Sequence, residues 1–213
     1  MRTLNEFRNP LACVALAIAM PLCHASFTTT TSQSDFVAAV TAPGTDTFET
    51  LATGELSSTV ARNAGAYAYS AFSVGGLFGL GTSDRWLSND DRRDPISFAG
   101  FSPGISAIGA TIFSTNETGA VLTDQTILVT ITDVLLNQST TTLTFNSSAT
   151  FFGVYSTVPL LSMTVSVDAN NLLAAWPTVN NLIVAVPEPS TCATLAAGLL
   201  AIGALLRRRA GRA

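Results

Sequence analysis

Leu161-Ser162-Met163-Thr164-Val165-Ser166-Val167 is the stretch that decides the fold class of this chain. Every odd-numbered residue in it is apolar, and every even-numbered residue carries a hydroxyl group. Side chains along a strand point alternately to the two faces of its sheet, so this period of two predicts a strand with one buried and one solvated face. Thr and Ser on the polar face suit the solvated side of an antiparallel sheet.

The prediction extends in both directions along the chain. Residues 28–34 are rich in Thr and Ser and are expected to form a flexible lead-in, after which Ser34 caps a short helix over Asp35–Val40 that ends at Pro43-Gly44. Further strands, separated by turn-prone residues, are expected at Thr45–Glu49, Ala66–Phe72, Ile96–Phe101, Ile105–Phe113, Thr126–Thr132, Thr141–Phe145, Thr150–Tyr155 and Asn181–Val186. The sequence therefore predicts an all-β fold, an antiparallel, jelly-roll-like β-sandwich with a short N-terminal helix.

The length and charge of the middle of the chain limit what it can be. Residues 26–185 number about 160 out of 213, which is enough for one hydrophobic core and too few for two. This part has four arginines, no lysine and twelve acidic residues, a net charge of −8. Such a surface repels phosphate backbones, so nucleic acid is excluded as a partner.

The N-terminal residues, 1–25, have the pattern of a secretory signal peptide. Arg2 and Arg8 precede a run of about twelve apolar residues, too short to span a bilayer, which needs roughly 20. Small residues at the end of the run place cleavage between Ala25 and Ser26. A lipoprotein signal at Cys23 is disfavoured because bulky Leu22 precedes it. The chain is therefore expected to meet the secretion translocon.

The C-terminal residues, 186–213, have the pattern of a membrane anchor. Residues 191–206 are uncharged and apolar, and as a transmembrane helix they would span about 24 Å. Arg207, Arg208 and Arg209 follow and are expected to act as a stop-transfer signal that stays in the cytoplasm. The domain is then expected on the other side of the membrane, in agreement with the signal peptide.

The residues just before this apolar segment carry a family resemblance. Val186 is followed by Pro187, Glu188 and Pro189, and the two prolines keep the chain extended and open to an enzyme. A Pro-Glu-Pro motif, an apolar helix and a terminal arginine cluster, in this order, resemble the PEP-CTERM sorting signal of Gram-negative bacteria, also described as an ice-binding protein C-terminal domain. The alternative is a plain tail anchor with an accidental Pro-Glu-Pro linker.

The resemblance implies that an exosortase recognises Pro187, Glu188 and Pro189 and cleaves nearby, in a bacterium that makes exopolysaccharide and biofilm matrix. The stretches Ala107–Phe113, Phe151–Val154 and Trp176–Leu182 also look like the ectodomain commonly found before this anchor. That second resemblance implies a sandwich and no defined ligand. An ice-binding face would need a longer regular threonine array than Thr140–Thr144 provides.

The residue types present exclude many kinds of catalysis in the exported domain. The single histidine is His24, and the cysteines are Cys13, Cys23 and Cys192, all in segments expected to be removed. A Ser-His-Asp or Cys-His site, a His/Cys zinc site and a disulfide are therefore excluded. No cofactor is expected. A pair of carboxylates acting on a glycosidic bond is the one remaining enzymatic alternative, and scattered solvating acids are the preferred interpretation.

Two groups of residues are candidates for binding. Trp86 and Trp176, with Tyr67 and Tyr69, are the candidate sugar contacts, because an aromatic ring offers an apolar face and a polar edge to a glycan, although aromatic residues in strands are more often core. Oxygen ligands for calcium are offered by an acidic, arginine-containing loop with Asp84, Asn89, Asp90, Asp91 and Asp94. The preferred interpretation of this loop is a solvated set of salt bridges with Arg85, Arg92 and Arg93.

The sequence as a whole predicts an exported, surface-sorted, non-enzymatic protein with a structural or adhesive role in the cell envelope or exopolysaccharide matrix. It is expected at the inner membrane first, with the domain in the periplasm, and then at the cell surface or outside. The alternatives are an extracellular carbohydrate-binding module that contacts polysaccharide and, less favoured, a carboxylate-dependent glycosidase.

Overall fold

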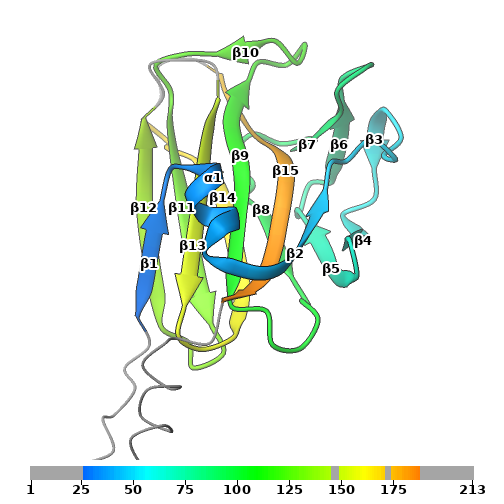
Figure 1. Cartoon of the computed structure of the whole chain (residues 1–213). Coiled ribbons are helices and arrows are strands. Elements are labelled where there is room, and N and C mark those ends of the chain that lie inside the picture. The colour runs from blue at the N-terminus through cyan, green and yellow to red at the C-terminus, as the bar shows by residue number, and fades with distance from the viewer. Residues whose placement is uncertain (1–25, 145–148, 171–173, 188–213) are drawn as a thin grey trace, which may run out of the picture.

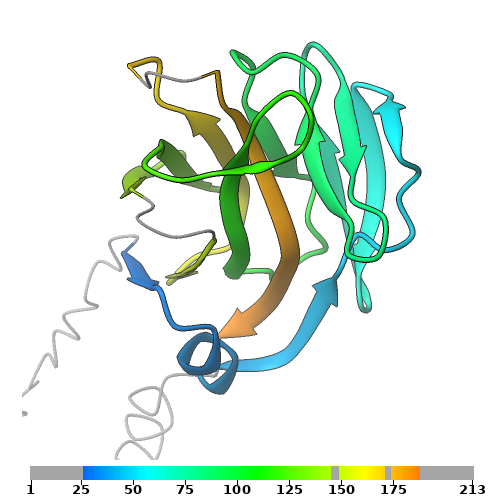
Figure 2. The same cartoon turned by 90° about the horizontal axis from the view of Figure 1, so that it is seen from above.

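Two antiparallel sheets pack face to face in the computed structural model, which describes residues 26–144, 149–170 and 174–187 (Figures 1 and 2). The nine-stranded sheet contains β1 (Phe27–Thr30), β2 (Val40–Asp46), β3 (Gly54–Leu56), β6 (Leu77–Leu80), β7 (Trp86–Asn89), β9 (Ala107–Thr115), β10 (Val121–Leu122), β13 (Thr150–Ser156) and β15 (Trp176–Pro187). The six-stranded sheet contains β4 (Thr59–Ala64), β5 (Tyr67–Phe72), β8 (Ile96–Ala99), β11 (Thr126–Asp133), β12 (Gln138–Thr144) and β14 (Leu160–Val167). The predicted antiparallel β-sandwich is confirmed.

Strand order explains how distant parts of the chain meet. The larger sheet follows the order β1-β13-β9-β15-β7-β6-β3, with β10 beside β9 and β2 beside β15. The smaller sheet follows the order β12-β11-β14-β8-β5-β4. β15, the last strand of the described chain, lies at the centre of the larger sheet between β9 and two earlier strands, β2 and β7. The fold is therefore closed by the residues that immediately precede the predicted sorting segment.

The alternating stretch forms β14 as predicted, with one correction at its start. Met163 and Val165 are buried in the core between the sheets. Leu161, in contrast, is exposed, because the register between β11 and β14 shifts by one residue there and pairs Asp133 with Leu160. This β-bulge turns Leu160 inward and Leu161 outward, which a strict period of two cannot predict.

The outer face of the smaller sheet carries hydroxyl groups in rows across the strands. The Thr130 and Thr140 hydroxyl oxygens lie 2.9 Å apart, and those of Ser97 and Thr164 lie 3.2 Å apart. Thr130 also pairs with Thr164 across β11 and β14. The Thr and Ser residues therefore face solvent as the sequence predicted, while their apolar neighbours fill the core.

The helix lies close to its predicted place, but its ends differ. α1 covers Gln33–Ala38 and is capped by Ser32, whose Oγ accepts a hydrogen bond from the backbone N of Asp35 at 3.2 Å. Pro43 and Gly44 do not end it; they lie within β2. Among the described strands β2 pairs with β15 alone. The register of this pair shifts between Val184 and Val186, opposite Thr41–Gly44. A proline is tolerated at such an irregular edge because no ladder donor is needed there.

Two other predictions need correction, and a third concerns a residue outside the described ranges. The expected flexible lead-in contains β1, which pairs with β13 from Phe27 to Thr30. Strands β3, β4, β6 and β7 were not predicted, and β7 occupies part of the expected acidic loop. Phe145, the expected end of one strand, lies outside the described residues. These strands are short or lack alternation, so their pairing partners, which are distant in sequence, determine them.

β1 begins and β15 ends at the same end of the sandwich (Figure 1). β15 continues to Pro187, which pairs with Val40, so the predicted sorting segment starts inside this strand. The predicted signal peptide (1–25, with Ala25), the predicted transmembrane helix (191–206) and Arg207–Arg209 lie outside the described residues. Across the residues that are described, the structure has no helix of the length and apolarity needed to cross a bilayer.

Candidate functional site

A depression of about 160 Å³ lies on the outer face of the nine-stranded sheet. Leu77 and Leu87 point into the core from β6 and β7, so alternate residues of these strands, such as Phe78, Leu80 and Ser88, face outward. The depression is lined by Phe78, Leu80, Ser88, Asn89, Asp90, Thr115, Asn116, Glu117 and Trp176. Strands β6, β7, β9 and β15 all contribute, so the β6–β7 pair and two strands distant from it in sequence build the depression.

Trp176 is the aromatic side chain with a polar tip in this lining. The ring is half-buried, and its Nε1 donates a hydrogen bond to the backbone O of Asp90 at 3.1 Å. That bond fixes the ring against the end of β7. A ring held in this way beside hydroxyl, amide and carboxylate groups has the chemistry that stacks on one face of a sugar and hydrogen-bonds its edge.

Trp86 lies on the same outer face but plays a different part. Its ring meets that of Phe113 edge to face, with 5.4 Å between the centroids and 84° between the planes. It is not among the residues that line the depression, and its buried Nε1 has no hydrogen-bond partner among the described residues. The structure therefore brings the two predicted tryptophans onto one face and places Trp176 alone on the depression.

Two lining residues of the depression, Ser88 and Thr115, belong to a row of buried hydroxyl groups that Thr178 completes. The Thr115 and Thr178 hydroxyl oxygens lie 3.0 Å apart, Thr178 donates to Ser88 Oγ at 3.4 Å, and Ser88 donates to the backbone O of Pro177 at 3.0 Å. These residues come from β9, β15 and β7, and they satisfy one another. The row therefore gives the depression two hydroxyl groups that already have partners.

Asn89 offers an unused acceptor at the wall of the depression. Its side chain is 3% exposed, and its Nδ2 donates to the backbone O of Asp91 at 2.8 Å and of Asp94 at 2.5 Å. Its Oδ1 is buried and accepts no hydrogen bond within the described parts of the chain. A buried acceptor without a partner is costly, but this atom has almost no exposed surface, so a ligand in the depression does not reach it unless its neighbours move. From sequence, Asn89 was a candidate oxygen ligand for calcium, and its buried position beside the depression was not predicted.

The predicted calcium ligands are not brought together as a set. Asp84 Oδ1 accepts from Asn180 Nδ2 at 2.9 Å, Asp94 Oδ2 from the backbone N of Gly75 at 2.6 Å, and Asp91 Oδ1 from the backbone N of Arg93 at 2.9 Å. Asp90 lies exposed at the depression. Over the described ranges, no three His, Cys, Asp or Glu side chains are grouped so that they could hold a metal ion.

The predicted salt bridges of this loop are also absent from the described residues. The one ion pair among the described residues joins Arg62 Nη2 and Asp46 Oδ1, which lie 2.6 Å apart and outside this loop. Arg85 instead donates from Nη1 to the backbone O of Leu51, and its backbone N donates to Glu49 Oε1 at 3.1 Å. Because β7 begins directly after Arg85, this side chain meets the loop that follows β2 rather than the acids beside it in sequence.

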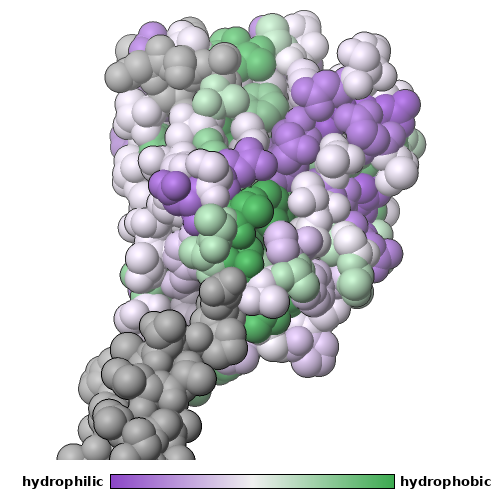
Figure 3. All heavy atoms as spheres, viewed as in Figure 1, coloured by the Kyte–Doolittle hydropathy of each residue, from purple (hydrophilic) through white to green (hydrophobic). Residues whose placement is uncertain are grey.

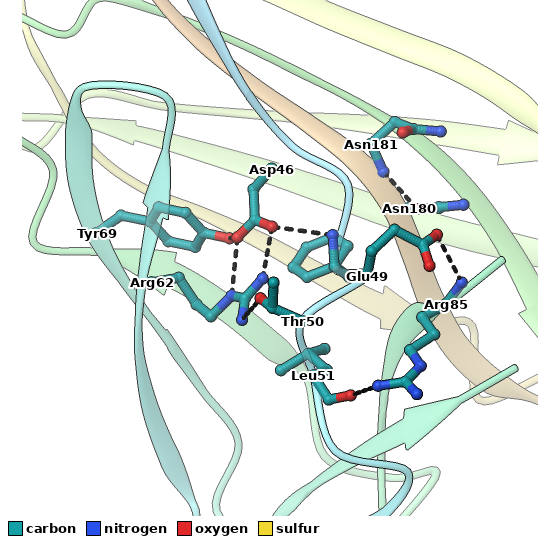
Figure 4. A network of polar contacts seen from close by, with 10 residues as sticks. Asp46, Glu49, Thr50, Leu51, Arg62, Tyr69, Arg85, Asn180 and Asn181 are labelled. Carbon is teal, nitrogen blue, oxygen red and sulfur yellow. Dashed lines mark hydrogen bonds and ion pairs between the residues drawn. The ribbon is translucent and has the colours of Figure 1, made fainter. Parts of the chain in front are cut away.

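A buried charge network joins β2, β4 and β5 (Figure 4). Asp46 is 5% exposed and accepts hydrogen bonds from Arg62 Nε at 2.8 Å, Arg62 Nη2 at 2.6 Å and the Tyr69 hydroxyl at 2.6 Å. The backbone N of Phe48 also donates to it at 2.9 Å, and the Arg62 guanidinium lies 5.5 Å from the centre of the Phe48 ring. Every lone pair direction of the carboxylate is thus engaged, which is what a buried charge requires.

The network shifts the proton affinities of its members. Burial opposes the charge of Arg62, but the hydrogen bonds and negative charge of Asp46 outweigh burial, so the pKa of Arg62 is raised. Burial, followed by the charge of Asp46, raises the pKa of Tyr69 far above its ordinary value. Tyr69 was a candidate sugar contact from sequence, and this is corrected: it is 2% exposed, and like Tyr67 it lies on β5 in the sheet opposite the tryptophans.

We expect the raised pKa of Tyr69 to make the fold sensitive to alkali. Above about pH 10 the unfolded chain loses the phenol proton while folded Tyr69 keeps it, so stability falls as pH rises, by about 1.4 kcal/mol per pH unit. Urea unfolding between about pH 9 and pH 12 measures this slope. Tyr69→Phe is expected to flatten it strongly. Tyr155→Phe is expected to flatten it less, because burial and the charge of Asp35 also raise the pKa of Tyr155 but this tyrosine is more exposed. An unchanged slope in Tyr69→Phe would show that another group controls alkaline stability.

Comparison with known proteins identifies the C-terminal segment. Residues 185–209 match the sequence model of the PEP-CTERM protein-sorting motif. The chain therefore carries a PEP-CTERM sorting motif, as the order of Pro-Glu-Pro, apolar run and arginines predicted. This motif implies an exported, envelope-directed protein. No curated protein matches the chain.

Several solved structures show a distant likeness to the fold. A family 6 carbohydrate-binding module is 13% identical, with a TM-score of 0.33 over 55% of this chain and 86% of its own. The CBM22-1 xylan-binding domain of Paenibacillus barcinonensis Xyn10C is 14% identical, with a TM-score of 0.35 over 68% and 94%. A family two carbohydrate esterase from Cellvibrio japonicus is 14% identical, with a TM-score of 0.32 over 58% of this chain and 36% of its own. Likeness at this level says nothing of what this chain binds.

Proposed function

We propose that this chain is an exported, surface-sorted, non-enzymatic protein with a structural or adhesive role in the cell envelope or exopolysaccharide matrix, and that an exosortase processes it. The observation that carries the proposal is the position of the sorting motif. The match begins at Ala185, inside the last strand of a sandwich whose other strands all precede it. The domain is thus complete as a fold at the point where the sorting signal takes over.

The residues of the domain support the non-enzymatic part of the proposal. The described residues contain no histidine, cysteine or lysine, which leaves carboxylates and tyrosine hydroxyls as the remaining acid–base groups. Asp90 and Glu117, which line the depression, are both exposed to solvent. A general acid needs a site that raises its proton affinity, and solvent exposure works against this.

Fractionation of the cells that produce the protein tests the proposal. We expect the mature domain in surface and matrix fractions, with the unprocessed chain in the inner membrane as a precursor. An antibody against the domain should label intact cells, with a cytoplasmic enzyme as the control for lysis. Recovery of most of the protein from the cytosol would overturn the proposal.

The depression at Trp176 favours a second candidate, an extracellular carbohydrate-binding module. The specific observation is a tryptophan ring fixed by a hydrogen bond and set beside hydroxyl, amide and carboxylate side chains in one hollow. Sugars offer apolar ring faces and many hydroxyl donors, and this lining complements both. A polysaccharide that leaves the cell through the same envelope is the ligand class that fits.

We expect glycan binding, if this candidate holds, to weaken about tenfold or more in Trp176→Ala, because a central aromatic side chain commonly supplies a large share of binding energy. Phe72→Ala, at an exposed aromatic residue on the other sheet, is the matched control and should bind as wild type does. A glycan array and affinity electrophoresis measure both variants. Equal binding by wild type and Trp176→Ala would remove the depression from consideration, and polysaccharide turnover lost on one Asp→Asn change would favour the glycosidase instead.

A further inference from the structure

An exposed apolar loop projects from the end of the sandwich where β11 turns into β12. Val134, Leu135 and Leu136 follow one another there, and their side chains are 49%, 60% and 72% exposed. We call these residues the 134–136 loop. Three consecutive apolar side chains in water are unfavourable, and such patches commonly mark an interaction surface.

Hydrogen bonds from the loop to the buried Asp133 hold the 134–136 loop in place. Asp133 is fully buried, and its Oδ1 accepts from the backbone N of Leu135 at 2.8 Å and of Asn137 at 3.0 Å. Asn137 Nδ2 donates to Asp133 Oδ2 at 3.0 Å. Leu136 has a φ of 65°, a left-handed conformation that favours glycine and strains a leucine. Leucine therefore occupies position 136, although the backbone conformation there favours glycine.

Backbone hydrogen bonds join this loop to the end of β15 through two neighbouring loops. Val134 N donates to Pro159 O at 3.0 Å, and Leu160 N donates to Ile105 O at 2.8 Å. The next residue, Ser106, donates from its N to Ala185 O at 3.2 Å. The 134–136 loop and the start of the sorting motif thus lie at one end of the domain, which also carries the exposed side chains of Leu161 and Val186.

This end of the domain differs in charge from the rest of its surface. The segments that form it, residues 26–27, 100–106, 133–138, 156–161 and 184–187, contain one charged residue, the fully buried Asp133. Asp35 is the acid of α1, which packs on the sheet face above. In Figure 3 the deep purple residues lie in the upper half and along the right-hand side, while pale and green residues occupy the lower end beside the grey atoms. An acidic domain turned with this end toward an anionic surface meets the least repulsion.

The chain that leaves this end reaches the apolar segment within a short distance. β15 is paired up to Pro187, and residues 188–190 separate it from the apolar run that starts at Thr191. Four steps of extended chain span at most about 14 Å. The domain is therefore tethered close to any bilayer that holds residues 191–206.

We propose that the 134–136 loop inserts into the bilayer surface while the domain is still anchored, so that the sandwich stands on the membrane by its uncharged end. This inference rests on the proposed function, because it requires the sorting segment to enter the membrane. The partner is the interfacial region of the lipid bilayer, which accepts leucine side chains beside a short tether. Insertion fixes the orientation of Pro187 at the membrane surface, where an integral-membrane enzyme acts.

Lipid quenching of a site-specific dye tests the proposal on the chain from Ser26 to Ala213, reconstituted in phosphatidylcholine vesicles that contain phosphatidylglycerol. A nitrobenzoxadiazole label is attached at Leu135→Cys in a Cys192→Ser background, at Thr118→Cys on the exposed β9–β10 turn at the opposite end, or at native Cys192. With brominated lipids we expect the label at 135 to be quenched at least about twofold more than the label at 118, and its emission to shift to the blue.

Each outcome of this experiment separates the two proposals. Quenching at Cys192 without quenching at 135 would overturn the loop insertion and leave the sorting anchor intact. No quenching at Cys192 would overturn both. A blue shift at 135 without lipid quenching would show that the label is buried against protein, such as a second copy of the chain. This result would also overturn the loop insertion.

Leu136→Gly keeps the test independent of folding. Glycine suits the φ of 65°, so this variant should be at least as stable as wild type. Combined with Val134→Ser, it removes two of the three apolar side chains, and quenching at 135 should fall to the level seen at 118. Undiminished quenching in this variant would contradict insertion by the loop.

Discussion

Asp46→Asn is expected to lower the free energy of unfolding by about 3–5 kcal/mol, because it leaves the Arg62 guanidinium in a buried site without its countercharge. The carboxylate accepts bonds from Arg62, Tyr69 and the backbone of Phe48, so one substitution weakens the contacts of three elements. For a domain of this size the melting temperature should fall by about 10 °C. Urea unfolding followed by tryptophan fluorescence measures the loss.

Two controls accompany this substitution. Glu55→Gln removes the same charge from an exposed position on β3 and should change stability by about 0.5 kcal/mol or less. Adding Arg62→Met to Asp46→Asn should restore part of the loss, since it removes the unpaired charge. A loss below about 1 kcal/mol in Asp46→Asn would mean that the pair behaves as an exposed one.

Deletion of residues 188–213 is expected to move the protein almost completely from the cell surface to the surrounding medium, with its fold unchanged. The cut follows Pro187, so the pairing of Pro187 with Val40 and every described strand remain whole. A cut one residue earlier would remove Pro187, which belongs to β15. Immunoblots of cells and medium, with circular dichroism of the secreted domain, measure the two parts of the prediction.

A motif variant distinguishes sorting from simple anchoring. Glu188→Ala with Pro189→Ala keeps the apolar segment and the arginines but removes the Pro-Glu-Pro sequence that an exosortase would read. This variant should accumulate uncleaved in the inner membrane, whereas the deletion is secreted. If the variant reached the surface and were processed as wild type is, the Pro-Glu-Pro sequence would be an incidental linker.

The fold could be predicted from sequence where a strand shows its own periodicity. Met163 and Val165 are buried as their alternation predicted, because one face of β14 meets the core along most of its length. The bulge at Leu161 could not be predicted, since it depends on the register with β11. The residues of β4 and β7 show no clear alternation, and these strands form because β5, β6 and β15 offer backbone partners.

The candidate site could be predicted only in part for the same reason. Trp176 and Trp86 stand out in a sequence with two tryptophans, and both lie on one face. Thr178 carries no such signal, because its contact with Ser88 joins residues 90 positions apart. The partner of Arg62 is Asp46, not an acid of the neighbouring loop, and only the folded chain brings those strands together.

Mass spectrometry of the mature protein's two termini tests the central claim, that the apolar segments at both ends serve delivery and the sandwich alone persists. We predict a first residue at or near Ser26 and a last residue between Pro187 and Thr191, which together retain every described strand. A surface-located form that begins at Met1 or ends at Ala213 would contradict the account.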